Sequence, residues 1–112
     1  MAKYIALNKN SDFRALYHRG KSQVHSALVT YVKKNRLGVT RVGITVGKKL
    51  GSAVERNRCR RIIREAYRQI MPRVPDGWDI VFVARRHTLK VKSTYILKIM
   101  QMHFKVLGVL DQ

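Results

Sequence analysis

Hydrophobic and polar positions follow a helical period near the start of this chain. The stretch SDFRALYHRG, residues 11–20, places Phe13, Leu16 and Tyr17 on one helical face. This spacing predicts a short helix with an aromatic side. We expect Ser11 or Asp12 to cap its start, and the glycine at its end to adopt a left-handed conformation.

The period then changes to the alternation that is typical of strands. Stretches rich in β-branched and aromatic residues are VHSALVTYVKK at 24–34, TRVGITVGKK at 40–49 and WDIVFVA at 78–84, with predicted turns at NRLG and PDG. In the second stretch, Val42, Ile44 and Val46 share one face. The early segment AKYIAL, residues 2–7, fits either a short strand or an irregular arm.

A long helix is predicted between the second and third strands. Ser52 to Glu55 reads SAVE, a capping box in which a hydroxyl and a carboxylate satisfy the first free amides. Pro72 ends the helix, which gives a length of about 18 residues or roughly 27 Å. Its predicted core face consists of Cys59, Ile62, Ile63, Ala66, Tyr67 and Ile70.

A third helix is predicted for STYILKIMQMHFKVLGVL, residues 93–110, with Ser93 or Thr94 as its cap. The order of helix, two strands, helix, strand and helix indicates an α/β fold, an α+β two-layer sandwich with helices on a small mixed sheet. The length of 112 residues predicts one domain that spans positions 1–112.

The net charge of the chain restricts the range of possible functions more than its length does. There are 24 lysines and arginines against six acids, a net charge of +18. Such a charge attracts anionic partners, and nucleic acid is the leading class because its binding releases counterions. The single cysteine fits a reducing compartment. The start carries no signal peptide and no apolar run could span a membrane, so we expect a soluble, cytoplasmic protein.

Most of the distinctive charge lies on the long helix. The basic and amide side chains of this region are Lys48, Lys49, Arg56, Asn57, Arg58, Arg60, Arg61, Arg64 and Arg68. A solvated helix face usually mixes charges of both signs, whereas this stripe has almost no acids. Arginine also binds phosphate oxygens through two parallel hydrogen bonds and stacks on bases. The pattern therefore favours nucleic-acid contact over a merely solvated face.

At this point the sequence resembles a known family. GSAVERNRCRRIIREAYR is similar to the signature of the protein subunit of bacterial ribonuclease P, and DFRALY, RVGITVGKKLG and WDIVFVAR extend the similarity over most of the chain. The departures are Tyr17, Gly47, Ser52 and Arg60, where phenylalanine, serine, asparagine and lysine are common. None of them removes a charge from the signature. The last 20 residues carry no specific match.

The resemblance implies a ribonucleoprotein endoribonuclease that matures the 5′ end of tRNA. Its RNA subunit would perform the cleavage with Mg²⁺, and the arginine helix would bind that RNA. The single-stranded 5′ leader of precursor tRNA would lie in a cleft between the first helix and the sheet. The implied leader-binding residues are Phe13, Tyr17, Val29, Tyr31 and Lys33. The implied fold is similar to domain IV of elongation factor G, with a left-handed crossover that departs from the usual rule.

Other interpretations of the same residues stay open. Phe13 and Tyr17 are one helical turn apart, which also fits an ordinary core pair. The whole pattern also fits a general RNA-binding or ribosome-associated protein. A DNA-binding module would call for a helix pair or dimer symmetry, and neither is evident, so no DNA partner is expected. The four histidines and six acids are scattered, so the sequence predicts neither a catalytic residue nor a metal site in this chain.

Overall fold

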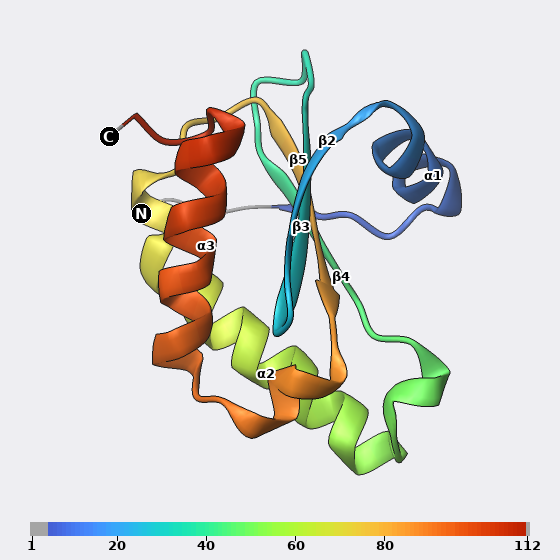
Figure 1. The fold of residues 1–112 in the computed structure, drawn as a ribbon. Helices are drawn as coiled ribbons and strands as arrows, with labels where there is room; N and C mark the ends of the chain where they lie inside the picture. Colours follow the sequence, from blue (N-terminus) through green and yellow to red (C-terminus); the bar gives the residue numbers. More distant parts are fainter. Residues whose placement is uncertain (1–4, 112) are drawn as a thin grey trace.

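The computed structural model describes residues 5–111. It consists of a mixed five-stranded sheet and three helices (Figure 1). The elements are β1 (Ile5–Ala6), α1 (Asn10–Arg19), β2 (Lys21–His25), β3 (Leu28–Lys34), β4 (Arg41–Thr45), α2 (Ala53–Ile70), β5 (Trp78–Ala84) and α3 (Ser93–Leu107), with the 3-10 turns η1 (Lys48–Leu50), η2 (Met71–Arg73) and η3 (Arg86–Lys90). This arrangement confirms the predicted α+β class with a small mixed sheet and helices packed on it.

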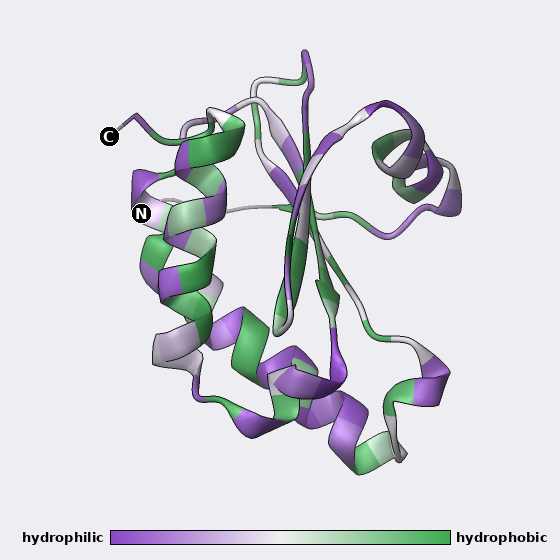
Figure 2. Cartoon of the chain, viewed as in Figure 1, coloured by the Kyte–Doolittle hydropathy of each residue, from purple (hydrophilic) through white to green (hydrophobic). Residues whose placement is uncertain are grey.

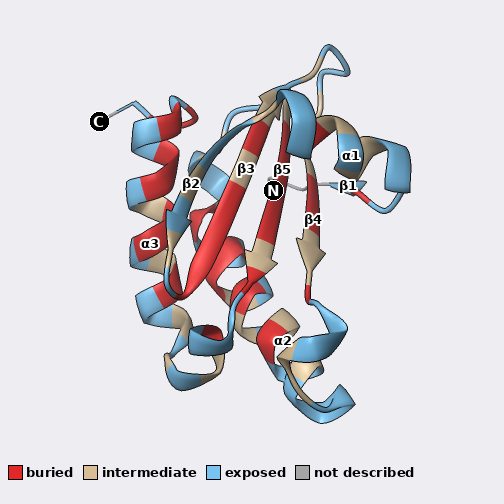
Figure 3. Cartoon of the chain, turned by 45° about the vertical axis from the view of Figure 1, so that its right-hand side comes forward, coloured by how far each residue is buried: buried red, intermediate tan, exposed pale blue. Residues whose placement is uncertain are grey.

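The strand order is β1-β4-β5-β3-β2. β1, β4 and β5 are parallel to one another, whereas β3 and β2 run antiparallel to their neighbours. α2 and α3 form a layer on one face of the sheet, and α1 lies alone on the other face, so the helices cover both faces, whereas the predicted two-layer arrangement implied only one (Figure 1). Figure 3 shows α1 in front of the sheet, the body of α2 behind it, and β5 to the left of β4 with both strands running downward. The β4–α2–β5 connection is therefore left-handed, against the general preference.

The larger core lies between the sheet and the α2–α3 layer. The hydropathy along α2 and α3 alternates between hydrophobic and hydrophilic residues, as amphipathic helices require (Figure 2). Phe82 of β5 packs against Tyr67 of α2 and Phe104 of α3, with ring centroids 5.6 and 5.9 Å apart. The predicted core face of α2 is confirmed, since five of its six residues are buried and Ile62 packs partly buried against the same cluster.

The capping box of α2 is confirmed. The Glu55 amide donates to Ser52 Oγ at 3.2 Å, and the Ser52 amide donates to Glu55 Oε1 at 2.9 Å. The predicted caps of the other helices are wrong, because Lys9 and Lys92 stand at the N-cap positions of α1 and α3 without side-chain hydrogen bonds. α3 also ends earlier than predicted, at a left-handed Gly108 with φ of 84°.

The end of α1 differs from the prediction in an instructive way. Gly20 is extended, with φ of −79°, and not left-handed. A glycine is needed at this position because there is no room for a side chain: a Cβ would lie 2.5 Å from the carbonyl oxygen of Leu16. The close approach of the chain to the last turn of α1 therefore excludes any side chain there.

The predicted strand over 24–34 is a hairpin. β2 ends at His25, two residues form the turn, and β3 begins at Leu28. The Ala27 amide donates to His25 Nδ1 at 3.0 Å and closes the turn. No glycine, proline, asparagine or aspartate marks this turn, which is why the pattern alone predicted one long strand. The early segment forms β1 over Ile5–Ala6, and its residues 2–4 lie outside the described residues.

Candidate nucleic-acid interface

The cationic side chains of α2 face outward because its apolar face is buried against the sheet and α3. The N-terminal half of this helix extends beyond the ends of the strands and is mostly hydrophilic (Figures 1 and 2). Lys48 and Lys49 lie in the exposed η1 turn directly before it. The fold thus projects one end of the arginine helix, with its two preceding lysines, away from the body of the protein.

The arginines of α2 differ in how far they are engaged within the protein. Arg56 Nη1 donates to the carbonyl oxygens of Lys48 and Gly51 at 3.2 and 3.1 Å, so it braces the turn before the helix. Arg68 Nη2 donates to both carboxylate oxygens of Glu65 at 2.8 and 2.7 Å. This contact also lowers the pKa of Glu65. Arg68 therefore carries a partly compensated charge.

The remaining cations of α2 lie along two sides of the helix. Arg60 and Arg64 line a hollow of about 200 Å³ at the sheet edge, whose floor is made by residues of β1 and β4 and by Leu7. Arg58 and Arg61 line another of about 380 Å³, together with Lys92 at the start of α3. Within residues 5–111, ion pairs involve only the cations Arg41 and Arg68. The α2 cations other than Arg68 therefore have no ion-pair partner in the described part of the chain.

Three of the predicted leader-binding residues come together on the opposite face of the sheet. The ring centroids of Phe13 and Tyr17 are 6.4 Å apart, and those of Tyr17 and Tyr31 are 4.9 Å apart in an edge-to-face contact. The Tyr17 hydroxyl lies 3.1 Å from Thr45 Oγ1, and Tyr17 is 40% exposed. Phe13 and Tyr31 pack partly buried against a small core under α1. We call Phe13, Tyr17 and Tyr31 the aromatic cluster. Its rings are both a packing element and a partly open surface.

The other two predicted leader-binding residues flank Tyr31 on the same face of β3. Val29 is buried, with only 8% of its surface exposed. Lys33 lines a hollow of about 340 Å³ beside Asp12, Arg41 and Asp79, and no residue of the aromatic cluster lines that hollow. Lys33 follows Tyr31 by two residues on the same face of β3, so its positive charge lies along the strand from the aromatic rings, beside that hollow. Binding of the leader by any of the five residues stays a prediction.

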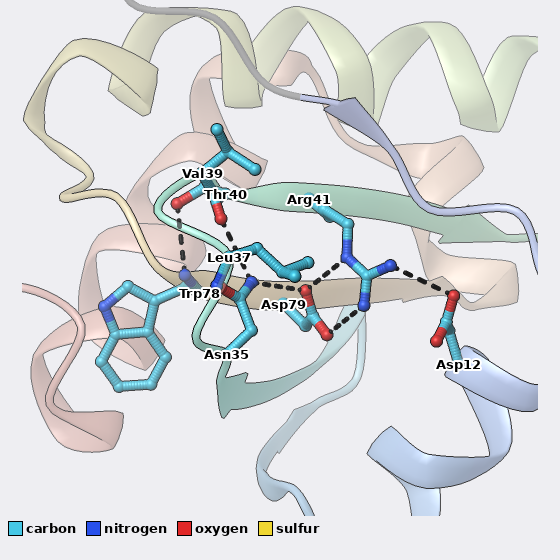
Figure 4. Close-up of polar contacts among 8 residues, drawn as sticks. All are labelled: Asp12, Asn35, Leu37, Val39, Thr40, Arg41, Trp78 and Asp79. Atoms are coloured by element: carbon cyan, nitrogen blue, oxygen red, sulfur yellow. Dashed lines mark hydrogen bonds and ion pairs between the residues drawn. The ribbon is translucent and has the colours of Figure 1, made fainter.

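A polar network that the sequence did not suggest joins α1 to the sheet (Figure 4). Arg41 donates to both carboxylate oxygens of Asp79, from Nε at 2.8 Å and from Nη2 at 2.7 Å. Its Nη1 donates to Asp12 Oδ2 at 3.2 Å. Asn35 Nδ2 donates to Asp79 Oδ1 at 2.8 Å and to the Val39 carbonyl oxygen at 3.1 Å. These residues come from three strands or their loops and one helix, so no local motif could have revealed the network.

Burial and hydrogen bonding act against each other at the centre of this network. Burial raises the pKa of Asp79, but hydrogen bonds from Arg41 and Asn35 outweigh it and hold the pKa below its usual value. The hydrogen bond to Asp79 likewise raises the pKa of Arg41. Both groups are therefore charged at neutral pH, and Asp12 and Asp79 are engaged with the guanidinium.

The remaining ionisable groups offer no assembled reaction centre within the described residues. Burial raises the pKa of the Cys59 thiol. His103 is buried against Thr30, with Nδ1 2.7 Å from Thr30 Oγ1, and burial lowers its pKa to about 4. Over residues 5–111, no three histidine, cysteine or acidic side chains gather as metal ligands. None of the described helices is long and apolar enough to cross a membrane.

Comparison with known proteins gives a consistent assignment. The family model described as Ribonuclease P matches residues 1–108. The chain is 52% identical over 80 residues to the ribonuclease P protein component of Clostridioides difficile, which covers 70% of each protein. It is 40% identical over 95 residues to that of a Thermoanaerobacter species, covering 79% of this chain and 82% of the relative.

Solved structures agree with the sequence relatives. The ribonuclease P protein of Staphylococcus aureus superposes with a TM-score of 0.83 at 31% identity, covering 97% of this chain and all of the other. That of Thermotoga maritima gives a TM-score of 0.77 at 27% identity, covering 96% and 98%. The family match, these relatives and the shared fold show that the chain belongs to the ribonuclease P family, as a protein component of that enzyme.

Proposed function

We propose that this chain binds the catalytic RNA subunit of ribonuclease P through α2 and the 5′ leader of precursor tRNA through the aromatic cluster. The observation that carries the proposal is the presence of two different surfaces on opposite faces of one sheet. One is cationic and rich in arginine, and the other is aromatic. A protein with a single RNA partner would need only one of them.

The α2 surface has the chemistry of a phosphate-binding face. Arg58, Arg60, Arg61 and Arg64 form no ion pair with any of residues 5–111, so their charges are available to an external anion. Neutralising RNA phosphates with these side chains releases counterions and drives association. Lys48 and Lys49 extend the positive field, while Asn57, whose Oδ1 accepts from Arg60 at 3.3 Å, adds a polar group between the arginines.

The aromatic cluster has the chemistry of a single-strand platform. Bases stack on aromatic rings with little selection among sequences, which suits leaders of varied sequence. Tyr17 is the most accessible of the three rings and Tyr31 lies directly beside it. Because mature tRNA lacks the leader, contacts here would favour binding of the precursor over the product. The protein would thereby raise affinity for the substrate without slowing release of the mature tRNA.

The bond cleavage itself is assigned to the RNA subunit. Mg²⁺ held by the RNA and the substrate would supply the chemistry of that step. The described acids do not form a ligand set for it, since Asp12 and Asp79 are engaged with Arg41 and the remaining acids lie apart. The contribution of this chain is the positive field that lowers repulsion between the phosphates of the two RNAs. We expect it to act in the cytoplasm, where tRNA precursors are processed.

The experiment that tests the proposal is cleavage of a precursor tRNA by a bacterial ribonuclease P RNA at low magnesium. The reaction is run without protein, with this chain, and with a variant that carries alanine at Arg56, Asn57 and Arg58. Rescue by the intact chain and its loss in the variant are the expected results. If the chain binds RNA but never rescues cleavage, a general RNA-binding role becomes the better account.

A further inference from the structure

We propose that Arg41 is a positioning residue for leader recognition, which acts through Asp12 to fix α1, and with it the aromatic cluster, on the sheet. The inference rests on the proposed function of the aromatic cluster. Arg41 belongs neither to this cluster nor to the arginines of α2. Its role follows from the contacts that one strand makes with one helix.

β4 contacts α1 through alternate residues. The guanidinium of Arg41 reaches Asp12 at 3.2 Å, and Thr45 Oγ1 lies 3.1 Å from the Tyr17 hydroxyl. Between them, Gly43 leaves room for a ring: a Cβ at this position would lie 2.8 Å from a ring atom of Phe13. Because alternate residues of a strand share one face, these three contacts form a single line. Two of the three α1 residues along it, Phe13 and Tyr17, belong to the aromatic cluster.

Arg41 is itself held firmly from the other side. Two hydrogen bonds of 2.8 and 2.7 Å tie its guanidinium to Asp79, which is 5% exposed and is also held by Asn35. This geometry fixes the plane of the guanidinium, so its remaining nitrogen points at α1 (Figure 4). Nη1 of Arg41 is therefore a hydrogen-bond donor in a fixed position, and the carboxylate of Asp12 on α1 accepts this hydrogen bond.

Asp12 and Phe13 are consecutive residues of α1, so the bond to Arg41 sets where the ring of Phe13 enters over Gly43. Loss of that bond would leave the start of α1 attached by apolar contacts, chiefly the buried Leu16, with the hydrogen bond between Tyr17 and Thr45 remaining only near the other end of the helix. Apolar contacts resist separation but tolerate sliding, because they have no preferred direction. We therefore expect α1 to stay packed but to lose its fixed register, and the stacking surface to lose its shape.

The negative charge of Asp12 distinguishes a positioning role from a purely electrostatic one. Removing an acid from a protein with a net charge of +18 strengthens its attraction for RNA in general. A purely electrostatic role for Asp12 therefore predicts tighter binding in Asp12→Asn, whereas a positioning role predicts weaker binding of the leader. Asp76, an exposed acid in the turn before β5, provides the matched control in Asp76→Asn.

The experiment uses holoenzyme reconstituted with a ribonuclease P RNA and two precursor substrates, one with a full leader and one with a single leader nucleotide. We expect Asp12→Asn and Arg41→Lys to lower the affinity advantage of the long leader by about three- to tenfold, through KM and not kcat. Asp12→Glu should keep most of that advantage, Asp76→Asn should not lower it, and affinity for the RNA subunit should not fall in any of these variants.

Three results would overturn the proposal. They are an unchanged or increased leader advantage in Asp12→Asn, an equal loss for both substrates, and a parallel loss of affinity for the RNA subunit. Asp12→Asn keeps the bond between Arg41 and Asp79, so the test stands even if Arg41→Lys fails to fold. Tyr31→Ala separates the two proposals: if it leaves the leader advantage intact, the aromatic cluster is not the leader site and both proposals fail. If only Tyr31→Ala lowers it, the positioning role alone fails.

Discussion

Two arginines one turn apart on α2 should contribute very differently to RNA binding. Arg64 forms no ion pair with the described residues, whereas Arg68 donates to both oxygens of Glu65 at 2.8 and 2.7 Å. At distances larger than the separation of the two charges, the fields of Arg68 and Glu65 nearly cancel. An RNA phosphate at such a distance therefore experiences little net charge from this pair. Arg64 should therefore release a counterion when RNA binds, and Arg68 should release little.

The size of the difference follows from counterion release. The logarithm of the binding constant falls with the logarithm of salt concentration by about 0.9 per neutralised duplex phosphate, or about 0.7 for single strands. We expect Arg64→Ala to reduce the slope by about 0.7 to 0.9, and Arg68→Ala by less than about 0.3. Over a fourfold rise in salt, the loss of Arg64 thus accounts for about threefold in affinity.

The assay is titration of the RNA subunit with each variant at several salt concentrations. Glu65→Gln provides a more direct test, because it removes the negative charge that compensates Arg68 without removing any cation. Its slope should become steeper than that of the parent protein, and Arg68→Ala in that background should now cost as much as Arg64→Ala. Equal slopes for Arg64→Ala and Arg68→Ala in the parent protein would refute the assignment of the compensated charge.

Three further predictions concern stability. Phe82→Ala should lower the free energy of unfolding by about 3 to 5 kcal/mol in urea titrations, because a fully buried ring would leave a cavity between α2 and α3; a cost below 1 kcal/mol would contradict the packing. Ser52→Ala should cost about 1 kcal/mol in the same assay through loss of the α2 cap, with the exposed Ser22→Ala as the control that should cost little. His103 has its folded pKa lowered to about 4, so it binds a proton more readily when unfolded, and stability should be full above about pH 6.5 and fall as the pH drops toward 4. The loss reaches at most about 3 kcal/mol, and urea titrations at several pH values of the parent protein and His103→Gln should show it in the parent alone.

The sequence predicted the features that depend on neighbours along the chain. The capping box of α2, its buried face and the end of the helix near Pro72 all follow from residues within a few turns of one another. The hairpin turn between β2 and β3 was missed because it contains only Ser26 and Ala27, with none of the glycine, proline, asparagine or aspartate that marks turns most strongly. The helix caps at Lys9 and Lys92 were missed because nearby serine, threonine and aspartate residues are better intrinsic caps.

What the sequence could not predict is the set of contacts between distant segments. Arg41 and Asp79 are 38 positions apart, and Arg41 and Asp12 are 29 apart. Each looks like an ordinary charged residue until the sheet brings β4 next to β5 and α1 over both. The same holds for the hollow beside Lys33, since alternation along β3 indicates a shared face but not which residues of α1 and β5 lie next to it.

β4 is the element through which the two proposed RNA surfaces are linked. Its even-numbered residues Val42 and Ile44 belong to the core under α2, and its odd-numbered residues contact α1 through Arg41, Gly43 and Thr45. A shift of β4 by one residue would exchange these two sets, because strand side chains alternate between faces. It would place a guanidinium in the main core and Val42 against the carboxylate of Asp12. The register of this one strand therefore sets the position of the aromatic cluster relative to the arginine helix, and through it the spacing between the two RNAs that the protein is proposed to bring together.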